Sequence, residues 1–167
     1  MNIPIEKHMS NTSNKAFIYL VKILSSRDYS EYQLRNKLRE KNFTQEEIDC
    51  SINEVKTRGF LREQVYSEIR IKGFMNRGYS PDYIQQKLSE ERINVTTETI
   101  DTVFTEYRMT PEDQIDRLIR KKIQGKSELD YDQQSKVLRY LLSKGHDFSH
   151  SKKILRNVLG ELASQNE

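Results

Sequence analysis

The sequence predicts an all-α protein made of three tandem three-helix repeats in an elongated, curved arrangement. Three observations predict this fold class: apolar residues recur at helical spacing, only 6 Gly and 3 Pro interrupt 167 residues, and one turn motif is repeated. No segment shows the strict apolar–polar alternation of a half-buried strand. We expect a flexible N-terminus at residues 1–14, followed by repeats at residues 15–61, 62–109 and 110–167.

Three helices are predicted in the first repeat. The first has an apolar face at spacing i, i+3, i+4, i+7, formed by Phe17, Leu20, Val21 and Leu24. The second is expected to begin at Ser30, because Ser30 and Gln33 have the spacing of a capping box. The third is expected to begin at Thr44, where Glu47 completes the same spacing, and to end at Gly59.

The second repeat begins with a less regular helix over about 62–76. The next helix is expected to begin at Ser80, with Pro81 at the first helical position, where proline costs least. The sixth helix has an apolar face formed by Ile100, Val103, Phe104 and Tyr107.

The third repeat opens with a helix that Thr110 and Pro111 begin. A polar stretch follows at residues 124–132. The eighth helix has an apolar face formed by Val137, Leu138, Leu141 and Leu142, and the ninth is expected to begin near Asp147. Helices of about 12–15 residues are unstable alone in water, so we expect these nine to pack in groups of three.

The turn motif is repeated with recognisable identity. Residues 27–38 and 77–88 align without a gap and share Arg, Tyr, Ser, Lys and Leu, while residues 144–155 form a weaker third copy. Each copy is expected to end a helix at a cation, to tuck a ring beneath the turn, and to cap the next helix. Repeats of this kind usually bind a long partner. A duplicated stable hairpin without a common ligand is the alternative interpretation.

No residue pattern typical of catalysis or metal binding is found in the sequence. His8 lies near the N-terminus, and His146 and His150 flank Asp147 without further His or Cys ligands nearby. His146 takes the place of the tyrosine in the other turns, which predicts a packing role. Cys50 lies on an apolar stripe and is expected to be a structural thiol. We therefore expect no enzyme activity, no cofactor and no metal.

The positions of the Lys and Arg side chains indicate the candidate binding residues. The chain has 28 Lys+Arg and 25 Asp+Glu, a net charge of +3, which argues against tight, purely electrostatic DNA binding. Locally, cations recur at equivalent positions of the turns and crowd the seventh and ninth helices. The candidates are Arg27, Arg77, Lys144, Lys37, Lys87, Arg120, Lys121, Lys122, Lys152 and Lys153. Ordinary solvation of helix faces is the alternative explanation for each patch.

Targeting signals are not recognised in the sequence. No apolar run approaches the ~18 residues needed to span a bilayer, and the first residues lack an apolar signal-peptide core. We expect a cytoplasmic protein that does not bind membranes.

The turns, taken together with two further segments, resemble the RecX family of bacterial regulatory proteins. The turns lead from a cation into an I/L-x-x-x-L-type helix at 27–38, 77–88 and 144–155, and the further segments are 58–61 and 141–145. The resemblance covers about residues 15–162. Three departures are Arg62 where the family usually has an acidic residue, His146 in an arginine-rich turn, and Ser151 where a large apolar residue is expected.

The resemblance implies a protein that lodges in the helical groove of the RecA–DNA filament, and we expect this protein to be a monomer. It implies inhibition of RecA ATP hydrolysis and strand exchange, a role in homologous recombination, DNA repair and the SOS response, and some direct DNA binding. One alternative is a helical-repeat nucleic-acid-binding protein that acts without RecA, because three-helix groups resemble helix-turn-helix modules. Another is a structural adaptor with an unrelated protein partner.

The predicted elongation can be measured by small-angle X-ray scattering. We expect a radius of gyration well above the ~16 Å of a compact domain of this length, because repeats contact mainly their neighbours. A value near 16 Å would contradict the elongated arrangement.

Overall fold

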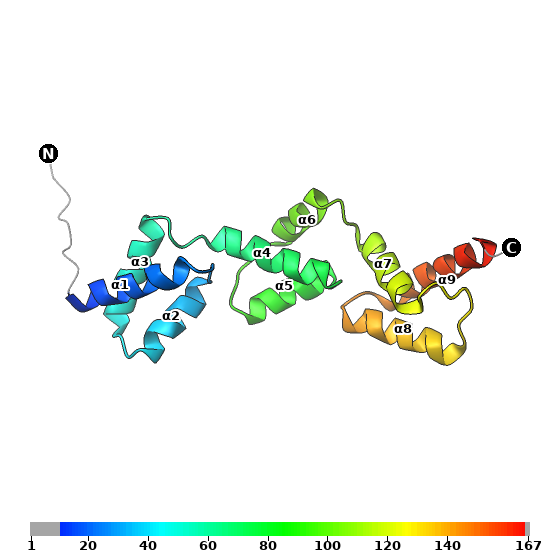
Figure 1. Cartoon of the computed structure of the whole chain (residues 1–167), viewed down its shortest axis with the longest axis horizontal. Coiled ribbons are helices and arrows are strands. Elements are labelled where there is room, and N and C mark those ends of the chain that lie inside the picture. Colours follow the sequence, from blue (N-terminus) through cyan, green and yellow to red (C-terminus); the bar gives the residue numbers. More distant parts are fainter. Residues whose placement is uncertain (1–10, 166–167) are drawn as a thin grey trace. The chain divides into compact units, whose positions relative to one another are not determined.

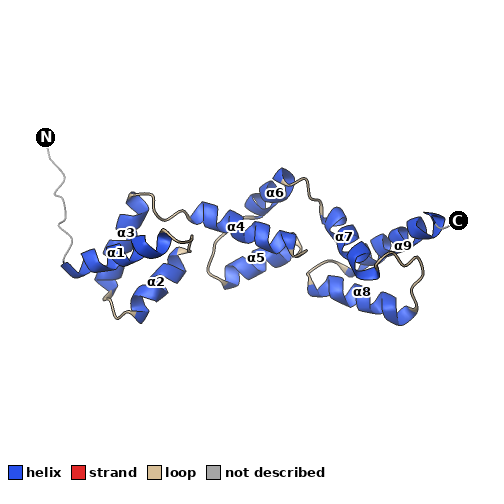
Figure 2. Ribbon diagram, viewed as in Figure 1, coloured by secondary structure: helices blue, strands red, loops and turns tan. Residues whose placement is uncertain are grey.

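The computed structural model describes residues 11–165, and every regular element in that range is a helix (Figures 1 and 2). The predicted all-α class is confirmed. The helices are α1 (Asn11–Leu24), α2 (Glu31–Glu40), α3 (Gln45–Thr57), α4 (Glu63–Asn76), α5 (Pro81–Glu90), α6 (Thr97–Glu106), α7 (Pro111–Ile123), α8 (Tyr131–Ser143) and α9 (Phe148–Gln165). Residues 1–10, which include His8 and most of the expected flexible N-terminus, lie outside the described residues.

The chain divides into two compact units, Met1–Ser67 and Glu68–Glu167. The boundary between them falls within α4. The division into three repeats that begin at residues 15, 62 and 110 stays a prediction.

The first unit encloses a core between α1, α2 and α3. Its buried side chains are Ala16, Leu20, Tyr29, Leu34, Leu38, Ile48, Ile52 and Val55. Ser30 and Gln33 form a capping box at α2, and Thr44 and Glu47 form one at α3, as predicted. Gly59 takes a φ of +72° and ends α3, also as predicted.

The beginning of α4 packs on the turn that precedes α2. The Glu63 carboxylate accepts a hydrogen bond from the Glu31 N–H at 3.0 Å, and the Tyr66 hydroxyl donates to the Gln33 side-chain oxygen at 3.2 Å. These bonds hold the first residues of α4 to the α1–α3 helices, which explains why the beginning of α4 belongs to the first unit.

The second unit contains two groups of helices. The α4–α6 group buries apolar side chains on each of its helices, namely Ile71, Met75, Ile84, Leu88, Ile100, Val103 and Phe104. The α7–α9 group encloses a core formed by Ile115, Leu118, Ile119, Ile123, Val137, Leu141, Leu155 and Val158. Ser80 caps α5 and Thr110 caps α7, each followed by proline at the first helical position, as predicted.

These two groups are joined at the end of α4. Carbonyl oxygens at a helix end lack helical partners and need donors from elsewhere. The buried Gln114 side chain of α7 donates to the Met75 carbonyl at 2.9 Å. His146 Nε2, in the turn between α8 and α9, donates to the Gly78 carbonyl at 2.9 Å. The α7–α9 group thus supplies donors to the end of α4.

The turns at 77–80 and 144–146 contact each other directly. The Ser80 N–H donates to the Lys144 carbonyl at 2.9 Å. Gly145 has a φ of +85°, and a Cβ there would lie 2.5 Å from Tyr83 Cβ and 2.6 Å from Ser80 Oγ. Only glycine fits this close approach, since any side chain would displace the facing turn. We call this contact the junction.

Two sequence-based expectations are wrong in detail. Tyr107 is 49% exposed, not part of the apolar face of α6, because Arg108 adopts a φ of +49° and the helix ends before Tyr107. Its ring instead lies 5.0 Å from Lys72 Nζ. Leu142 is 43% exposed and does not belong to the buried face of α8.

Two helices begin earlier than the sequence suggests. α8 begins at Tyr131, inside the expected polar stretch, because the Asp130 carboxylate accepts the Gln133 N–H at 2.8 Å. α1 begins at Asn11, inside the expected N-terminal segment, because its first turn is polar and precedes the apolar face on which the prediction relied.

The close approach at Gly145 predicts a packing-dependent loss of stability. Gly145→Ala should lower the free energy of unfolding by about 1–3 kcal/mol beyond the cost of a positive φ. Gly59→Ala is the matched control, because Gly59 has a similar φ of +72° but no atom within 4 Å of a built Cβ. Urea denaturation followed by circular dichroism measures both; equal losses would contradict the packing argument.

Candidate binding surface

The first repeated cation lies on an aromatic ring. Arg27 Cζ is 4.6 Å from the centroid of Tyr29, and Lys37 Nζ is 5.3 Å from the same centroid. Tyr29 is buried beneath the turn, as the motif predicts. A cation near a ring face is attracted by the ring quadrupole. One ring therefore brings together two of the candidate residues of the first unit.

Arg77, the second repeated cation, contacts two rings and the end of a helix. Its Cζ lies 4.5 Å from the centroid of Phe74 and 5.7 Å from that of Tyr79. Its Nε donates to the Gly73 carbonyl at 3.0 Å. This bond places the positive charge at the C-terminus of α4, where the helix dipole favours a cation.

Lys144, the third repeated cation, extends from one group of the second unit to the other. Its Nζ lies 4.0 Å from the centroid of Tyr79 in the α4–α6 group and 5.6 Å from that of Tyr140 on α8. The Tyr79 ring stacks on Tyr83, with centroids 4.9 Å apart and planes 8° apart. Lys144 and Tyr83 thus both contact the Tyr79 ring.

Two more candidate lysines contact these tyrosines. Lys122 Nζ lies 4.8 Å from the centroid of Tyr140, and Lys87 Nζ lies 5.4 Å from that of Tyr83. Lys87 also donates to the Glu90 carboxylate at 2.8 Å, and this hydrogen bond raises the pKa of the lysine. The cation–tyrosine surface is the name we give to Arg77, Lys87, Lys122 and Lys144 with Tyr79, Tyr83 and Tyr140.

Most of the positive charge on this surface is not neutralised. Among the described residues, no carboxylate lies within 4.0 Å of the charged nitrogens of Arg77, Lys122 or Lys144, and only Lys87 has an ion-pair partner. The rings hold these cations in place without cancelling their charge. Such a surface attracts an anionic partner.

The other predicted cations of α7 and α9 lie in different surroundings. Arg120 pairs with Asp116 at 2.8 Å and with Glu161 at 2.5 Å, and these bonds raise the pKa of its guanidinium. Lys153 lines a hollow of about 390 Å³ between α7 and α9, whose lining also includes Glu112 and Glu161. Lys121 and Lys152 are exposed. The structure therefore brings Lys122 and Lys144 together at Tyr140 and places Arg120 and Lys153 among carboxylates.

The two described histidines have structural partners. The His146 ring is buried, as predicted for a packing role, and burial lowers the pKa of its imidazole although the hydrogen bond to Gly78 opposes the shift. His150 Nε2 lies 3.2 Å from a Glu112 oxygen. Cys50 is half-buried in α3. Within residues 11–165, no three His, Cys, Asp or Glu side chains converge as metal ligands.

Comparison with known proteins identifies the family. A family model for the first three-helix domain of RecX matches residues 16–54. The regulatory protein RecX of Haemophilus influenzae (strain ATCC 51907 / DSM 11121 / KW20 / Rd) is 34% identical over 134 residues, which cover 80% of this chain and 88% of the relative. The chain belongs to the RecX family. The regulatory protein RecX of Pasteurella multocida (strain Pm70) is 30% identical over 161 residues, covering 87% of this RecX-family chain and 94% of the relative.

Solved structures share the fold of this RecX-family chain. The crystal structure of RecX from Lactobacillus salivarius superposes with a TM-score of 0.71 at 20% identity and covers 90% of this chain and 98% of that one. A second crystal structure, of a regulatory protein RecX, gives a TM-score of 0.68 at 19% identity. The match covers 86% of this chain and 71% of that one. The RecX resemblance of the turn motifs is confirmed.

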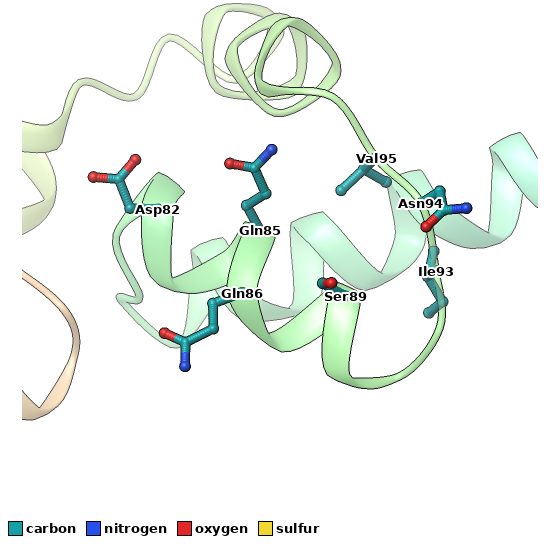
Figure 3. A pocket seen from close by; sticks show the side chains of 7 residues that line it. All are labelled: Asp82, Gln85, Gln86, Ser89, Ile93, Asn94 and Val95. Carbon is teal, nitrogen blue, oxygen red and sulfur yellow. The ribbon is translucent and has the colours of Figure 1, made fainter.

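In the described part of this RecX-family chain, neither a membrane-spanning helix nor a further hollow adds to the candidate cations. No helix in the described part of the chain is long and apolar enough to span a bilayer. A hollow of about 370 Å³ lies along α5 and the segment that follows it (Figure 3). Its polar lining consists of Asp82, Gln85, Gln86, Ser89 and Asn94. It includes none of the candidate cations.

Sequence reasoning missed the aromatic half of the surface. Tyr83 lies four residues after Tyr79 and four before Lys87, and Tyr140 lies four residues before Lys144. Residues at this spacing are neighbours on a helix. A sequence signal was therefore present for Tyr83 and Lys87 on α5, and for the local pairs Tyr79–Tyr83 and Tyr140–Lys144 at helix ends. No sequence signal indicated the approach of Lys144 to Tyr79, which lies 65 positions away.

The ring of Tyr79 gives a test of this geometry. Tyr79→Phe keeps the stacking and the cation contact and should change the free energy of unfolding by less than about 0.5 kcal/mol, whereas Tyr79→Leu should cost about 1–3 kcal/mol. In NMR spectra, the ε-methylene protons of Lys144 should be shifted upfield by the ring in the wild type and in the Phe variant. An undiminished shift in the Leu variant would contradict the contact, because only the more distant Tyr140 ring, 5.6 Å from Lys144 Nζ, then remains.

Proposed function

We propose that this RecX-family chain binds the RecA nucleoprotein filament and inhibits its ATPase and strand-exchange activities in recombination and DNA repair. The proposal rests on family membership and on the observation that unneutralised cations are held on tyrosine rings in both units. The proposed contacts are Arg27, Lys37, Arg77, Lys87, Lys122 and Lys144, with exposed Lys121 and Lys152 as further contacts of the third repeat.

The cation–tyrosine surface suits a nucleoprotein partner in two ways. Its cations are already placed over rings, so less side-chain freedom is lost when an anion binds. The faces of Tyr79 are occupied by Lys144 and Tyr83, which leaves no face for a nucleic-acid base to stack on. The surface therefore favours charge contacts with phosphates or carboxylates, which are independent of base sequence.

Inhibition by binding needs no chemistry from this chain. Among residues 11–165, the Cys50 thiol is half-buried on α3, and His146 and His150 are held by structural contacts. We propose that the protein acts as a monomer that occupies a site on the filament, with no turnover of its own.

Charge removal on the repeated turns tests the function. Changing Arg27, Arg77 and Lys144 together to Gln should weaken inhibition of the RecA ATPase on single-stranded DNA at least tenfold at about 150 mM salt. The salt dependence of binding should become shallower, because fewer counterion-linked contacts remain. Titration of each variant into a RecA ATPase assay measures the effect.

A matched triple variant controls for net charge. Three other cations each pair with a carboxylate, namely Lys56, Arg58 and Arg120. Changing these three to Gln removes the same number of positive charges as the first triple variant. This variant should inhibit RecA like the wild type. If the first triple variant also inhibits like the wild type, the proposed surface is wrong.

The second candidate function is nucleic-acid binding without RecA. It is favoured by the same unneutralised cations, because their charge attracts the phosphates of naked nucleic acid as well as the acidic groups of a protein partner. Co-sedimentation with RecA filaments, compared with filter binding to naked single- and double-stranded DNA at several salt concentrations, separates the two. Equal affinity for naked DNA and for the filament would support this alternative.

A further inference from the structure

The junction within the second unit places a buried histidine beside the proposed binding cations. We propose that His146 is a positioning residue whose neutral ring holds Lys144 over Tyr79, and that protonation of the ring opens the junction and separates the cations of the two groups. The consequence for binding rests on the proposed function; the opening itself does not.

Three consecutive residues of the turn between α8 and α9 hold it to the α4–α6 group. The Lys144 carbonyl accepts from the Ser80 N–H, Gly145 packs against the Tyr83 side chain, and the His146 ring donates to the Gly78 carbonyl at 2.9 Å. The ring is 5% exposed. Because this backbone is fixed, the Lys144 ammonium reaches a point 4.0 Å from the Tyr79 centroid.

The junction suits only the neutral ring. A neutral imidazole that donates from Nε2 leaves Nδ1 without a proton, whereas protonation adds a second donor and a positive charge. Among the described residues, no carboxylate is in hydrogen-bond contact with the ring. Asp147, the nearest acid in the sequence, already accepts the His150 N–H at 2.7 Å.

The elements packed here carry charged and titratable groups of both signs. They are Lys144, Asp147 and His150 on the turn and α9, Arg77, Tyr79, Asp82 and Tyr83 on the segment from α4 to α5, and Glu112, Asp113, Asp116 and Arg117 on α7. Glu112 is paired with His150, and Arg117 donates to the Asn76 carbonyl at 3.4 Å. Burial is the main cause that lowers the pKa of His146, and the charges of His150 and Lys144 lower it further.

The sign of the pH dependence follows from this lowered pKa. The open form, with an exposed imidazole of pKa about 6.5, binds a proton more readily than the closed form. The junction is therefore closed above about pH 6.5, and the fraction open rises as pH falls below that value. A single proton allows at most a tenfold increase in the open-to-closed ratio per pH unit.

Opening would divide the cation–tyrosine surface. Lys122 and Lys144 belong to the α7–α9 group, while Arg77 and Lys87 belong to the α4–α6 group. The junction is the contact that fixes the backbone of Lys144 beside Tyr79. A partner that binds the open form must first restore this arrangement, which weakens binding.

Amide hydrogen exchange of the full chain, measured by NMR between pH 7.5 and pH 5.5, tests the opening directly. The Ser80 amide donates across the junction, so its protection, corrected for the intrinsic exchange rate, should fall severalfold as pH drops. The Ile93 amide donates to the Leu88 carbonyl within the α4–α6 group and should keep its protection. Constant Ser80 protection over this range would overturn the proposal.

Variants of the two described histidines make the test specific. His146→Gln keeps an N–H donor without a titrating ring, so Ser80 should stay protected at both pH values. His146→Ala should lower the protection at both. His150→Gln is the control and should keep the wild-type response. A His146→Gln variant with the wild-type pH response would overturn the proposal even if the Ala variant does not fold.

The functional consequence is measured separately from the opening. The ratio of RecA ATPase inhibition by wild type to that by His146→Gln should fall between pH 7.5 and pH 6.0, by less than about fourfold, because one proton with an open-form pKa of about 6.5 allows no larger shift over this range. Exchange data need no RecA, so a chain that fails to inhibit RecA at any pH refutes the proposed function and leaves the junction result intact. A constant ratio alongside a pH-dependent Ser80 amide overturns the link between the junction and binding.

Discussion

The second unit depends on one constraint, the close contact of two glycine-containing turns. Gly78 and Gly145 both take positive φ, of +81° and +85°. A Cβ at Gly78 would lie 2.6 Å from Leu118 Cδ2, as one at Gly145 would press on Tyr83. Without side chains at these points, backbone donors and acceptors of two helix groups come within hydrogen-bond distance. The buried hydrogen bonds from Gln114 to the Met75 carbonyl and from His146 to the Gly78 carbonyl require this close approach of the two helix groups.

The repeated turn has the same use in each unit, because it supplies the place where a later segment packs. In the first unit, the turn before α2 receives the beginning of α4 through Glu63 and Arg62, which pairs with Asp28 at 3.0 Å. In the second unit, the turn before α5 receives the turn between α8 and α9. The recurring tyrosine supports both turns. The motif therefore has a structural role in addition to the cation that it presents.

Rings explain how a chain with little net charge can present a positive surface. Many of its basic side chains are paired with acids, as Arg35, Arg58 and Arg120 are. Arg77, Lys122 and Lys144 are instead held by aromatic rings. A carboxylate partner would hold a cation and cancel its field, whereas a tyrosine holds it with its charge intact. Fixed position and retained charge are what an anionic partner requires.

The helical class, most helix starts and the packing role of His146 could be predicted from the amino-acid sequence. These follow from local physics: capping boxes such as Ser30–Gln33, proline at the first helical position, and apolar periodicity act within a few residues. It also indicated the cations of the turns, because the repeat is visible as identity. It could not reveal that Lys144 lies on Tyr79 or that Arg120 is neutralised by Glu161, since these contacts join residues 65 and 41 positions apart. Which cations are neutralised and which are not follows from the packing of the helices, because an ion pair or a ring contact between helices depends on how those helices pack.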